Sequence, residues 1–353
     1  MNQNGVRALV LLGLMLSLGA ASTTFAQSTP RRSITPITGD LYRGQNDNHF
    51  TVFLVTDEGI ILTDPINAGF ATWLKSELDS RFGVPVRYVL YSHHHGDHAS
   101  GGDVFADTAQ FVGHENMLGH LALPPESTTL PVDGQYAIAA TMDANGNGRI
   151  ERSEASGTIL NNFSGFDANG NGELSGAEVL RGPLSAVRAP DITYSTTTMI
   201  SLGGTQVEMT WVGEMNHSMD MSVITFPAER AMHIVDFITF QRLPYREMDF
   251  ENGLFDEWMS AIKHWESLAD EYDYISPGHG PLGDISDIRE WRRYFEKLRD
   301  AVADSIAAGQ SLEEMRASIE IEEYSDWEGY SWLDENVLGM YHFLTDDDDN
   351  SLR

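Results

Sequence analysis

Short apolar runs separated by polar turns occupy the first part of the chain, from residue 51 to residue 112. Residues 51–55 and 60–62 are apolar and rich in strand-forming residues, and Thr56-Asp57-Glu58-Gly59 between them is typical of a turn, so the pattern predicts a β-hairpin. Residues 70–81 have helical spacing, and residues 86–91 and 110–112 resemble buried strands. This alternation predicts an α/β layered domain whose polar residues gather at strand ends.

Further strand and helix signals follow in the second half of the chain. Apolar runs predict four strands, at residues 193–200, 207–212, 221–226 and 232–235. Residues 255–272 predict a helix with Trp258, Ile262 and Trp265 on one face, and residues 285–308 and 312–319 predict two more helices. Between residues 123 and 190 a stretch rich in Pro, Asp, Asn and Gly interrupts the pattern.

The first 26 residues predict a secretory signal peptide rather than a part of the fold. Residues 8–20 are apolar but too short to span a bilayer, and Thr24-Phe25-Ala26 places small residues at the −3 and −1 positions before Gln27. We therefore expect an exported protein, secreted or periplasmic, without membrane attachment after cleavage. At the other end, the acidic run at residues 346–349 predicts a solvated tail.

Composition narrows the partners and the chemistry. The net charge of −31 disfavours nucleic acid as a partner, and composition leaves the oligomeric state open. We expect a small-molecule substrate. The chain has no cysteine, so neither disulfides nor thiolate metal ligands are available. Imidazole and carboxylate ligands remain, and these suit zinc, with iron and manganese as alternatives.

A cluster of metal-ligand residue types follows the strand predicted at residues 86–91, in the order His93-His94-His95-Gly96-Asp97-His98. On an extended loop His93 and His95 point the same way, while Asp97 and His98 project toward a second position. We expect His94, between the ligands, to point away. The cluster therefore predicts a metal-binding loop at a strand end.

This hexapeptide matches H-x-H-x-D-H, the signature of the metallo-β-lactamase superfamily, which the chain resembles over roughly residues 37–282. Asp64 resembles the family's early aspartate, which supports the metal loop. His217 resembles the third histidine, Asp236 the bridging aspartate, and His279, in Pro277-Gly278-His279-Gly280, the last histidine. The resemblance implies a four-layer αββα sandwich in which one metal is bound by His93, His95 and His217 and the other by Asp97, His98 and His279, with Asp236 bridging them.

The resemblance also implies a reaction. Two zinc ions would supply a bridging hydroxide that attacks an ester, lactone, thioester or amide (β-lactam-like) bond, and the catalytic carboxylates Asp97 and Asp236 would carry protons. Two alternatives stay open: an iron-dependent redox enzyme on the same fold, and a calcium-dependent binding protein with an inactive hydrolase core. One departure is visible, since residues 97–102 read D-H-A-S-G-G where the family has D-H-x-G-G.

The gap between His95 and His217 is wider than this fold needs, and it contains two similar twelve-residue segments that begin at Asp143 and Asp167. Both resemble EF-hand calcium loops, with oxygen-bearing residues at positions 1, 3, 5, 9 and 12 and glycine at position 6. The resemblance implies calcium ligation by Asp143, Asn145, Asn147, Arg149, Glu151 and Glu154, and by Asp167, Asn169, Asn171, Glu173, Ser175 and Glu178. A single carboxylate among positions 1, 3 and 5 predicts weak affinity and a structural clip.

These patterns predict five segments. They are a signal peptide (1–26), the first part of a metallo-β-lactamase domain (35–130), a small helical EF-hand-like insertion (131–187), the second part of the domain (188–290), and C-terminal helices with an acidic tail (291–353). Other histidines, among them His49 and His120, belong to no recognisable motif, and we expect them to lie outside the site.

Overall fold

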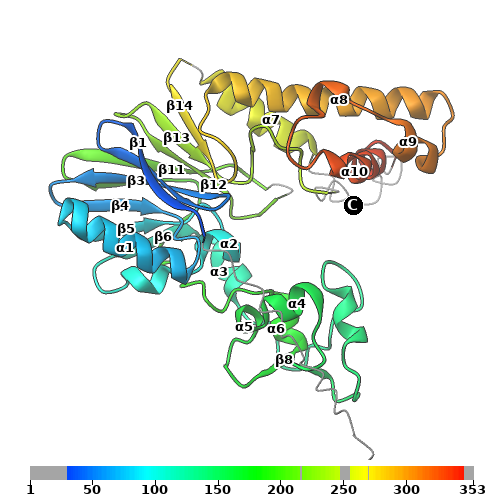
Figure 1. The fold of residues 1–353 in the computed structure, drawn as a ribbon, viewed down its shortest axis with the longest axis horizontal. Helices are drawn as coiled ribbons and strands as arrows, with labels where there is room; N and C mark the ends of the chain where they lie inside the picture. Colours follow the sequence, from blue (N-terminus) through cyan, green and yellow to red (C-terminus); the bar gives the residue numbers. More distant parts are fainter. Residues whose placement is uncertain (1–29, 215–216, 247–254, 269, 346–353) are drawn as a thin grey trace, which may run out of the picture. The chain divides into compact units, whose positions relative to one another are not determined.

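The computed structural model describes residues 30–214, 217–246, 255–268 and 270–345 (Figure 1). The predicted signal peptide and the acidic run at residues 346–349 lie outside these described residues. Across the described ranges, no helix has the length and apolar character needed to span a membrane.

The first sheet contains seven strands in the order β1-β2-β3-β4-β5-β6-β9. The strands from β1 to β4 pair antiparallel, and those from β4 to β9 pair parallel. Their bounds are β1 (Arg32–Thr38), β2 (Leu41–Asn46), β3 (His49–Thr56), β4 (Gly59–Thr63), β5 (Val86–Leu90), β6 (Gln110–His114) and β9 (Ile192–Tyr194). The predicted hairpin is therefore β3–β4, whereas the edge strand β1, with mixed polar residues, was not predicted.

The second sheet contains β10 (Thr197–Leu202), β11 (Thr205–Trp211), β12 (Ser222–Phe226), β13 (Ala231–Ile234) and β14 (Tyr274–Pro277). Its pairs are antiparallel except β13–β14, which is parallel. The prediction of one strand at residues 193–200 is wrong, because the chain leaves the first sheet after Tyr194 and enters the second at Thr197. An apolar run does not reveal such a crossing between sheets.

Three apolar clusters define the layers. Side chains of both sheets, such as Leu90 and Ile224, fill the space between them. Helix α1 (Ala68–Phe82) covers the outer face of the first sheet, and α7 (Phe255–Ser267) and α8 (Ile285–Ala307) cover that of the second (Figure 1). This order of helix, sheet, sheet and helix confirms the predicted α/β sandwich. Further helical elements are α2 (Gly96–Ala99), η1 (Gly102–Phe105), α3 (Asn116–Leu121), α9 (Leu312–Ser318), η4 (Glu322–Tyr324), η5 (Tyr330–Trp332) and α10 (Leu333–Thr345).

The segment between β6 and β9 has a small apolar cluster of its own, which includes Phe163 and Phe166. Its two short strands, β7 (Arg149–Glu151) and β8 (Glu173–Ser175), pair antiparallel with Ile150 opposite Leu174. These two buried residues occupy position 8 of the two predicted calcium loops. The helical elements of the segment are η2 (Ala137–Thr141), α4 (Gly157–Asn161), α5 (Phe163–Phe166) and α6 (Gly176–Arg181).

Residues 182–188, here called the strap, link α5 and α6 to the loop that carries Asp97. The Ser185 N–H donates to Gly165 O (2.9 Å), and the Gly101 N–H donates to Ala186 O (3.0 Å). Ser100 and Val187 form a β-bridge. The strap thus contacts both the helix before the second predicted calcium loop and the predicted metal loop.

Candidate metal centre

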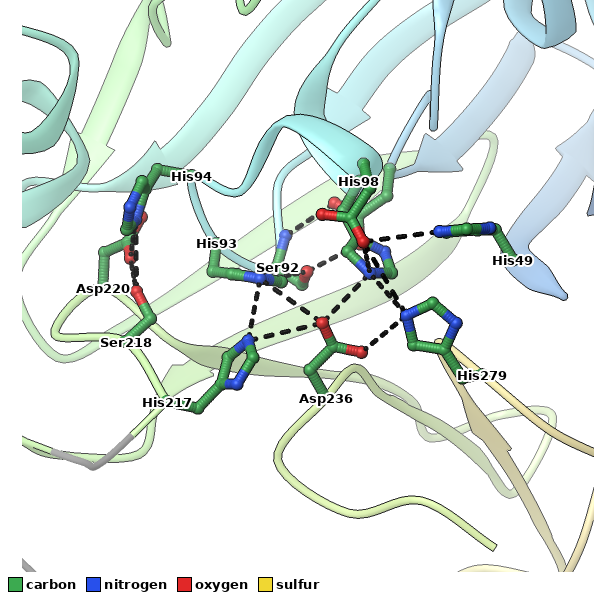
Figure 2. A network of polar contacts seen from close by, with 12 residues as sticks. His49, Ser92, His93, His94, His98, His217, Ser218, Asp220, Asp236 and His279 are labelled. Carbon is green, nitrogen blue, oxygen red and sulfur yellow. Dashed lines mark hydrogen bonds and ion pairs between the residues drawn. The ribbon is translucent and has the colours of Figure 1, made fainter. Parts of the chain in front are cut away.

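The residues that could hold metal ions lie in segments that connect the strands of the two sheets with the next elements (Figure 2). Strand β5 leads into His93 and His95, β13 ends before Asp236, and β14 ends before His279. Parallel neighbours present their carboxyl ends at the same edge, so β13 and β14 bring Asp236 and His279 together.

A first group of metal-ligand atoms comes from His93, His95, His217 and Asp236. The Nε2 atoms of His93 and His217 lie 3.3 Å apart, and His217 Nε2 lies 3.3 Å from Asp236 Oδ2. These are the residues that the sequence assigned to the first metal, together with the expected bridging carboxylate.

A second group comes from Asp97, His98, Asp236 and His279. The Nε2 atoms of His98 and His279 lie 3.2 Å apart, and they contact Asp236 Oδ2 and Oδ1 at 3.1 and 3.2 Å. Asp236 is therefore shared by both groups. Its backbone has a φ of 53°, an uncommon conformation for a residue other than glycine, and one that recurs at functional sites.

The spacing of these atoms fits metal ions. Ligands about 2.1 Å from a tetrahedral ion lie roughly 3.4 Å from one another, close to the separations in both groups. Asp236 Oδ1, although buried, accepts no hydrogen bond from the described residues. Nitrogen and oxygen donors in this number suit zinc, and they also accept iron and manganese.

The protonation of the first group also suits metal binding, because ligating imidazoles must be neutral. Burial, with help from the neighbouring His217, lowers the pKa of His95 to about 3. Burial and the nearby imidazoles hold the pKa of His93 well below its ordinary value. In the second group burial would lower the pKa of His98, but Asp236 and Asp97 raise it to about 10, so a cation would replace a proton there.

Asp64 contacts the metal loop through Ser92 rather than directly. The Ser92 N–H and Oγ–H donate to the two oxygens of Asp64 at 2.9 and 2.6 Å, and Ser92 Oγ lies 3.0 Å from His93 Nδ1. Burial raises the pKa of Asp64 to about 6. Asp64 thus lies where the resemblance placed it, behind the first metal group. Ser92, which carries the contact, was not identified from the sequence.

His49 was expected to lie outside the site, and this expectation is wrong. Its Nε2 lies 3.3 Å from Asp97 Oδ2, and its ring packs edge-on against His279 (Figure 2). The contact forms because β3 begins beside the end of β14: the Phe50 N–H donates to Gly278 O, and His279 Nδ1 donates to Asn48 O.

His94 points away from the two groups, as expected, and toward Asp220 (Figure 2). His120, also expected to lie outside the site, stacks on the His94 ring with centroids 3.8 Å apart and planes at 4°. His94, His120 and Asp220 could form a third group of metal ligands by distance. Rings stacked face to face have parallel lone pairs that do not converge on one ion, so we regard this cluster as a packing and hydrogen-bonding network.

The two predicted calcium loops have the same local structure. In each, both oxygens of the first aspartate accept backbone N–H bonds, as Asp143 does from Gly146 and Gly148 at 2.8 Å. The last glutamate reaches back to the start of its loop: Glu154 accepts from the Ala144 N–H (3.1 Å) and Glu178 from the Ala168 N–H (2.9 Å). Between these anchors the first asparagine of each loop accepts a backbone N–H from the second, Asn145 from Asn147 and Asn169 from Asn171, both at 3.0 Å.

The chain matches the family model of the metallo-beta-lactamase superfamily over residues 45–170. Among solved structures it is similar to the stereoselective inverting sec-alkylsulfatase Pisa1 from Pseudomonas sp., with a TM-score of 0.56 and 14% identity over 91% of this chain. A double mutant of the sec-alkyl sulfatase PisA1 gives a TM-score of 0.57, also with 14% identity over 91% of this chain. The chain spans only 52% of either sulfatase structure.

A metallo-beta-lactamase from Pontibacter korlensis aligns over 73% of this chain and 96% of its own, with 16% identity and a TM-score of 0.48. A search of curated protein sequences finds no match. The matching family model and the sulfatase structures agree with the layered architecture. The chain therefore has a metallo-beta-lactamase fold.

Proposed function

We propose that this chain is a hydrolase of the metallo-beta-lactamase superfamily that uses two zinc ions to cleave an ester, lactone, thioester or amide bond of a small-molecule substrate. One observation carries the proposal: seven side chains between residues 93 and 279 converge in two groups that share Asp236. Two dications held there would supply hydroxide at neutral pH and polarise the scissile carbonyl.

Asp97 and Asp236 differ in the role that their surroundings permit. The Asp236 side chain is only 10% exposed and faces imidazoles of both groups, so its carboxylate would hold metal ions in both groups. The Asp97 side chain is 53% exposed, so its carboxylate can exchange a proton with solvent or with the substrate's leaving group. We therefore assign proton transfer chiefly to Asp97.

The insertion supports a second part of the proposal, that two calcium ions clip it into shape. The paired strands β7 and β8 join the two loops, and in each loop the first aspartate and the last glutamate accept hydrogen bonds from the loop's own backbone. Calcium sites of such low charge would be filled in a calcium-rich environment. This agrees with export by the leader at residues 1–26, which we propose as the route out of the cell.

A substrate panel tests the hydrolase. Metal-free protein is reloaded with zinc, manganese or iron and assayed with an ester, a lactone, a thioester, a β-lactam and a secondary alkyl sulfate, the last because of the sulfatase neighbours. We expect turnover of at least one class with zinc, reduced at least about 100-fold by Asp236→Asn, because the amide lacks the negative charge and the second ligating oxygen that both metals would share.

Two other outcomes would replace this proposal. Dioxygen consumption by the iron form, without hydrolysis by the zinc form, would make the chain an iron-dependent redox enzyme. Stoichiometric metal binding without turnover of any panel member would favour a binding protein with an inactive core.

A further inference from the structure

Two separate loops supply the three histidines of the first metal group, and a buried network joins these loops on the side away from the metal groups (Figure 2). Asp220 is at its centre, with 1% of its surface exposed. Its Oδ1 accepts a hydrogen bond from His94 Nδ1 (2.9 Å) and another from Ser218 Oγ. Ser218 Oγ also lies 3.2 Å from His94 Nδ1, so the three side chains contact one another.

The two partners of Asp220 are sequence neighbours of the histidines in the first metal group. His94 lies between His93 and His95, and Ser218 directly follows His217. In an extended segment, alternate side chains point to opposite sides, so holding the His94 ring on one side directs His93 and His95 to the other. One carboxylate therefore holds a neighbour of every histidine in the first group.

The backbone around Asp220 is held at additional points. The Ser222 N–H donates to Ser92 O (2.8 Å), and Asn116 Nδ2 donates to Met219 O (2.8 Å). These contacts fix the segment after His217 against β5 and α3, but they do not act on the direction of the His94 side chain. The Asp220 carboxylate, by contrast, bonds to the His94 ring in one loop and to the Ser218 hydroxyl in the other.

The Asp220 carboxylate is buried, and its burial costs free energy that its hydrogen-bond donors must offset. A buried carboxylate destabilises a protein unless donors surround it. Burial would raise the pKa of Asp220, but the hydrogen bond and charge of His94 and the hydroxyl of Ser218 bring it below the ordinary value. Ser218 is only two residues from Asp220, whereas His94 reaches Asp220 only when the two histidine loops lie in their observed arrangement.

We propose that Asp220 is a positioning residue for the first metal group, which aligns His93, His95 and His217 by bonding His94 to Ser218. This inference rests on the proposed two-metal function. It extends that function to a residue that makes no contact with the metal ligands themselves.

Stepwise zinc affinity tests the proposal, measured by competition with a chromogenic chelator on metal-free protein. Asp220→Ala should weaken one zinc equivalent roughly 10–100-fold and leave the other within about twofold, as expected for loss of a contact that orients ligands. Asp220→Asn, which keeps an acceptor oxygen, should restore much of the affinity. In cobalt-loaded protein, the visible bands of the weakened site should change in shape.

Two comparisons separate positioning from general destabilisation. The His94→Ala/Asp220→Ala double variant should bind zinc no more weakly than the weaker single variant, since both substitutions break one network. His120→Ala, which removes only the ring stacked on His94, should bind both equivalents as the wild type does.

Equal weakening of both equivalents by Asp220→Ala, no weakening at all, or additive effects in the double variant would overturn the proposal. A wild-type protein that binds no zinc would instead remove the proposed metal centre itself, and the positioning role with it.

Discussion

His49 Nε2 lies 3.3 Å from Asp97 Oδ2, although 48 positions separate the two residues in the chain. His49 begins β3 and Asp97 belongs to α2, so two elements far apart in sequence meet at the second metal group. The His49 ring also lies 4.5 Å from that of His279, edge-on. A donor in this position orients a ligating carboxylate from outside the metal shell.

Replacing His49 should therefore affect the second metal group. His49→Ala should weaken one zinc equivalent roughly tenfold and lower kcat, because Asp97 loses the group that orients it. His49→Gln keeps an N–H donor, so its zinc affinity and kcat should lie between those of His49→Ala and the wild type. Chelator competition and steady-state kinetics measure both effects, and unchanged affinity in His49→Ala would show that the contact does not orient Asp97.

A second prediction concerns calcium. Adding about 1 mM calcium to metal-free protein should raise the thermal midpoint by several degrees, because filling sites with a Kd near 0.1 mM contributes about 1.4 kcal/mol each. Glu154→Gln and Glu178→Gln, at position 12 of each loop, should reduce the rise. Glu126 is exposed and lies outside both loops, so Glu126→Gln should leave the calcium-induced rise of the midpoint unchanged. A midpoint insensitive to calcium in the wild type would remove the clip.

Backbone conformation at Gly101 gives a third prediction. Gly101 has a φ of +86°, and a Cβ there would lie 2.5 Å from Ala68 N and Asn67 C. Gly101→Ala should thus destabilise the fold by about 1–3 kcal/mol. A Cβ added at Gly119, in α3, would meet open space. Gly119→Ala should therefore leave the fold as stable as before or stabilise it by up to about 1 kcal/mol. Urea unfolding compares the two, and equal stabilities would contradict the described loop.

Acid sensitivity gives a fourth prediction. Burial lowers the pKa of His233 to about 3. Below pH 6.5 the unfolded chain takes up a proton that the folded chain excludes until about pH 3, so stability falls as pH is lowered through this window. At pH 5 the free energy of unfolding is lower by about 2 kcal/mol because of this one group.

Replacing His233 should remove this part of the pH dependence of stability. In metal-free protein, His233→Gln should have a flatter dependence of unfolding free energy on pH between 6.5 and 4. The exposed His264→Gln should follow the wild type. If the wild type and His233→Gln had parallel pH profiles, His233 would not be excluding the proton.

The residues of the two metal-ligand groups could be predicted from the sequence because their residue types carry the chemistry and stand in recognisable motifs, such as the hexapeptide that begins at His93. His49 could not, because a single histidine at the start of a strand has no local signature, and its contact depends on how β3 lies beside β14. Asp220 was hidden for a related reason. Its partner His94 is an intervening residue of the metal motif, and although the sequence predicts that His94 points away from the metal ligands, only the fold shows that it points toward Asp220.

The strands were predictable where an apolar run forms them, as in β4 and β12, whose residues are all buried. The half-exposed edge strand β1 lacks that pattern. Strands β2 and β14 are largely buried but were not predicted, because β2 carries polar residues and β14 is short and ends in Pro277. The predicted helix at residues 255–272 is α7, which ends at Ser267. Helix ends depend on local caps, which apolar spacing does not encode.

The bond from Gly101 to the strap has a consequence for anyone shortening this protein. A trimmed version that deletes everything from residue 131 to residue 187 would leave the Gly101 N–H without Ala186 O, and Ser100 without Val187. Ser100 and Gly101 lie in residues 97–102, the segment that has one residue more than the family pattern, and both contact the strap. A minimal scaffold should therefore end its deletion before Gly182 and bridge the cut with a flexible linker.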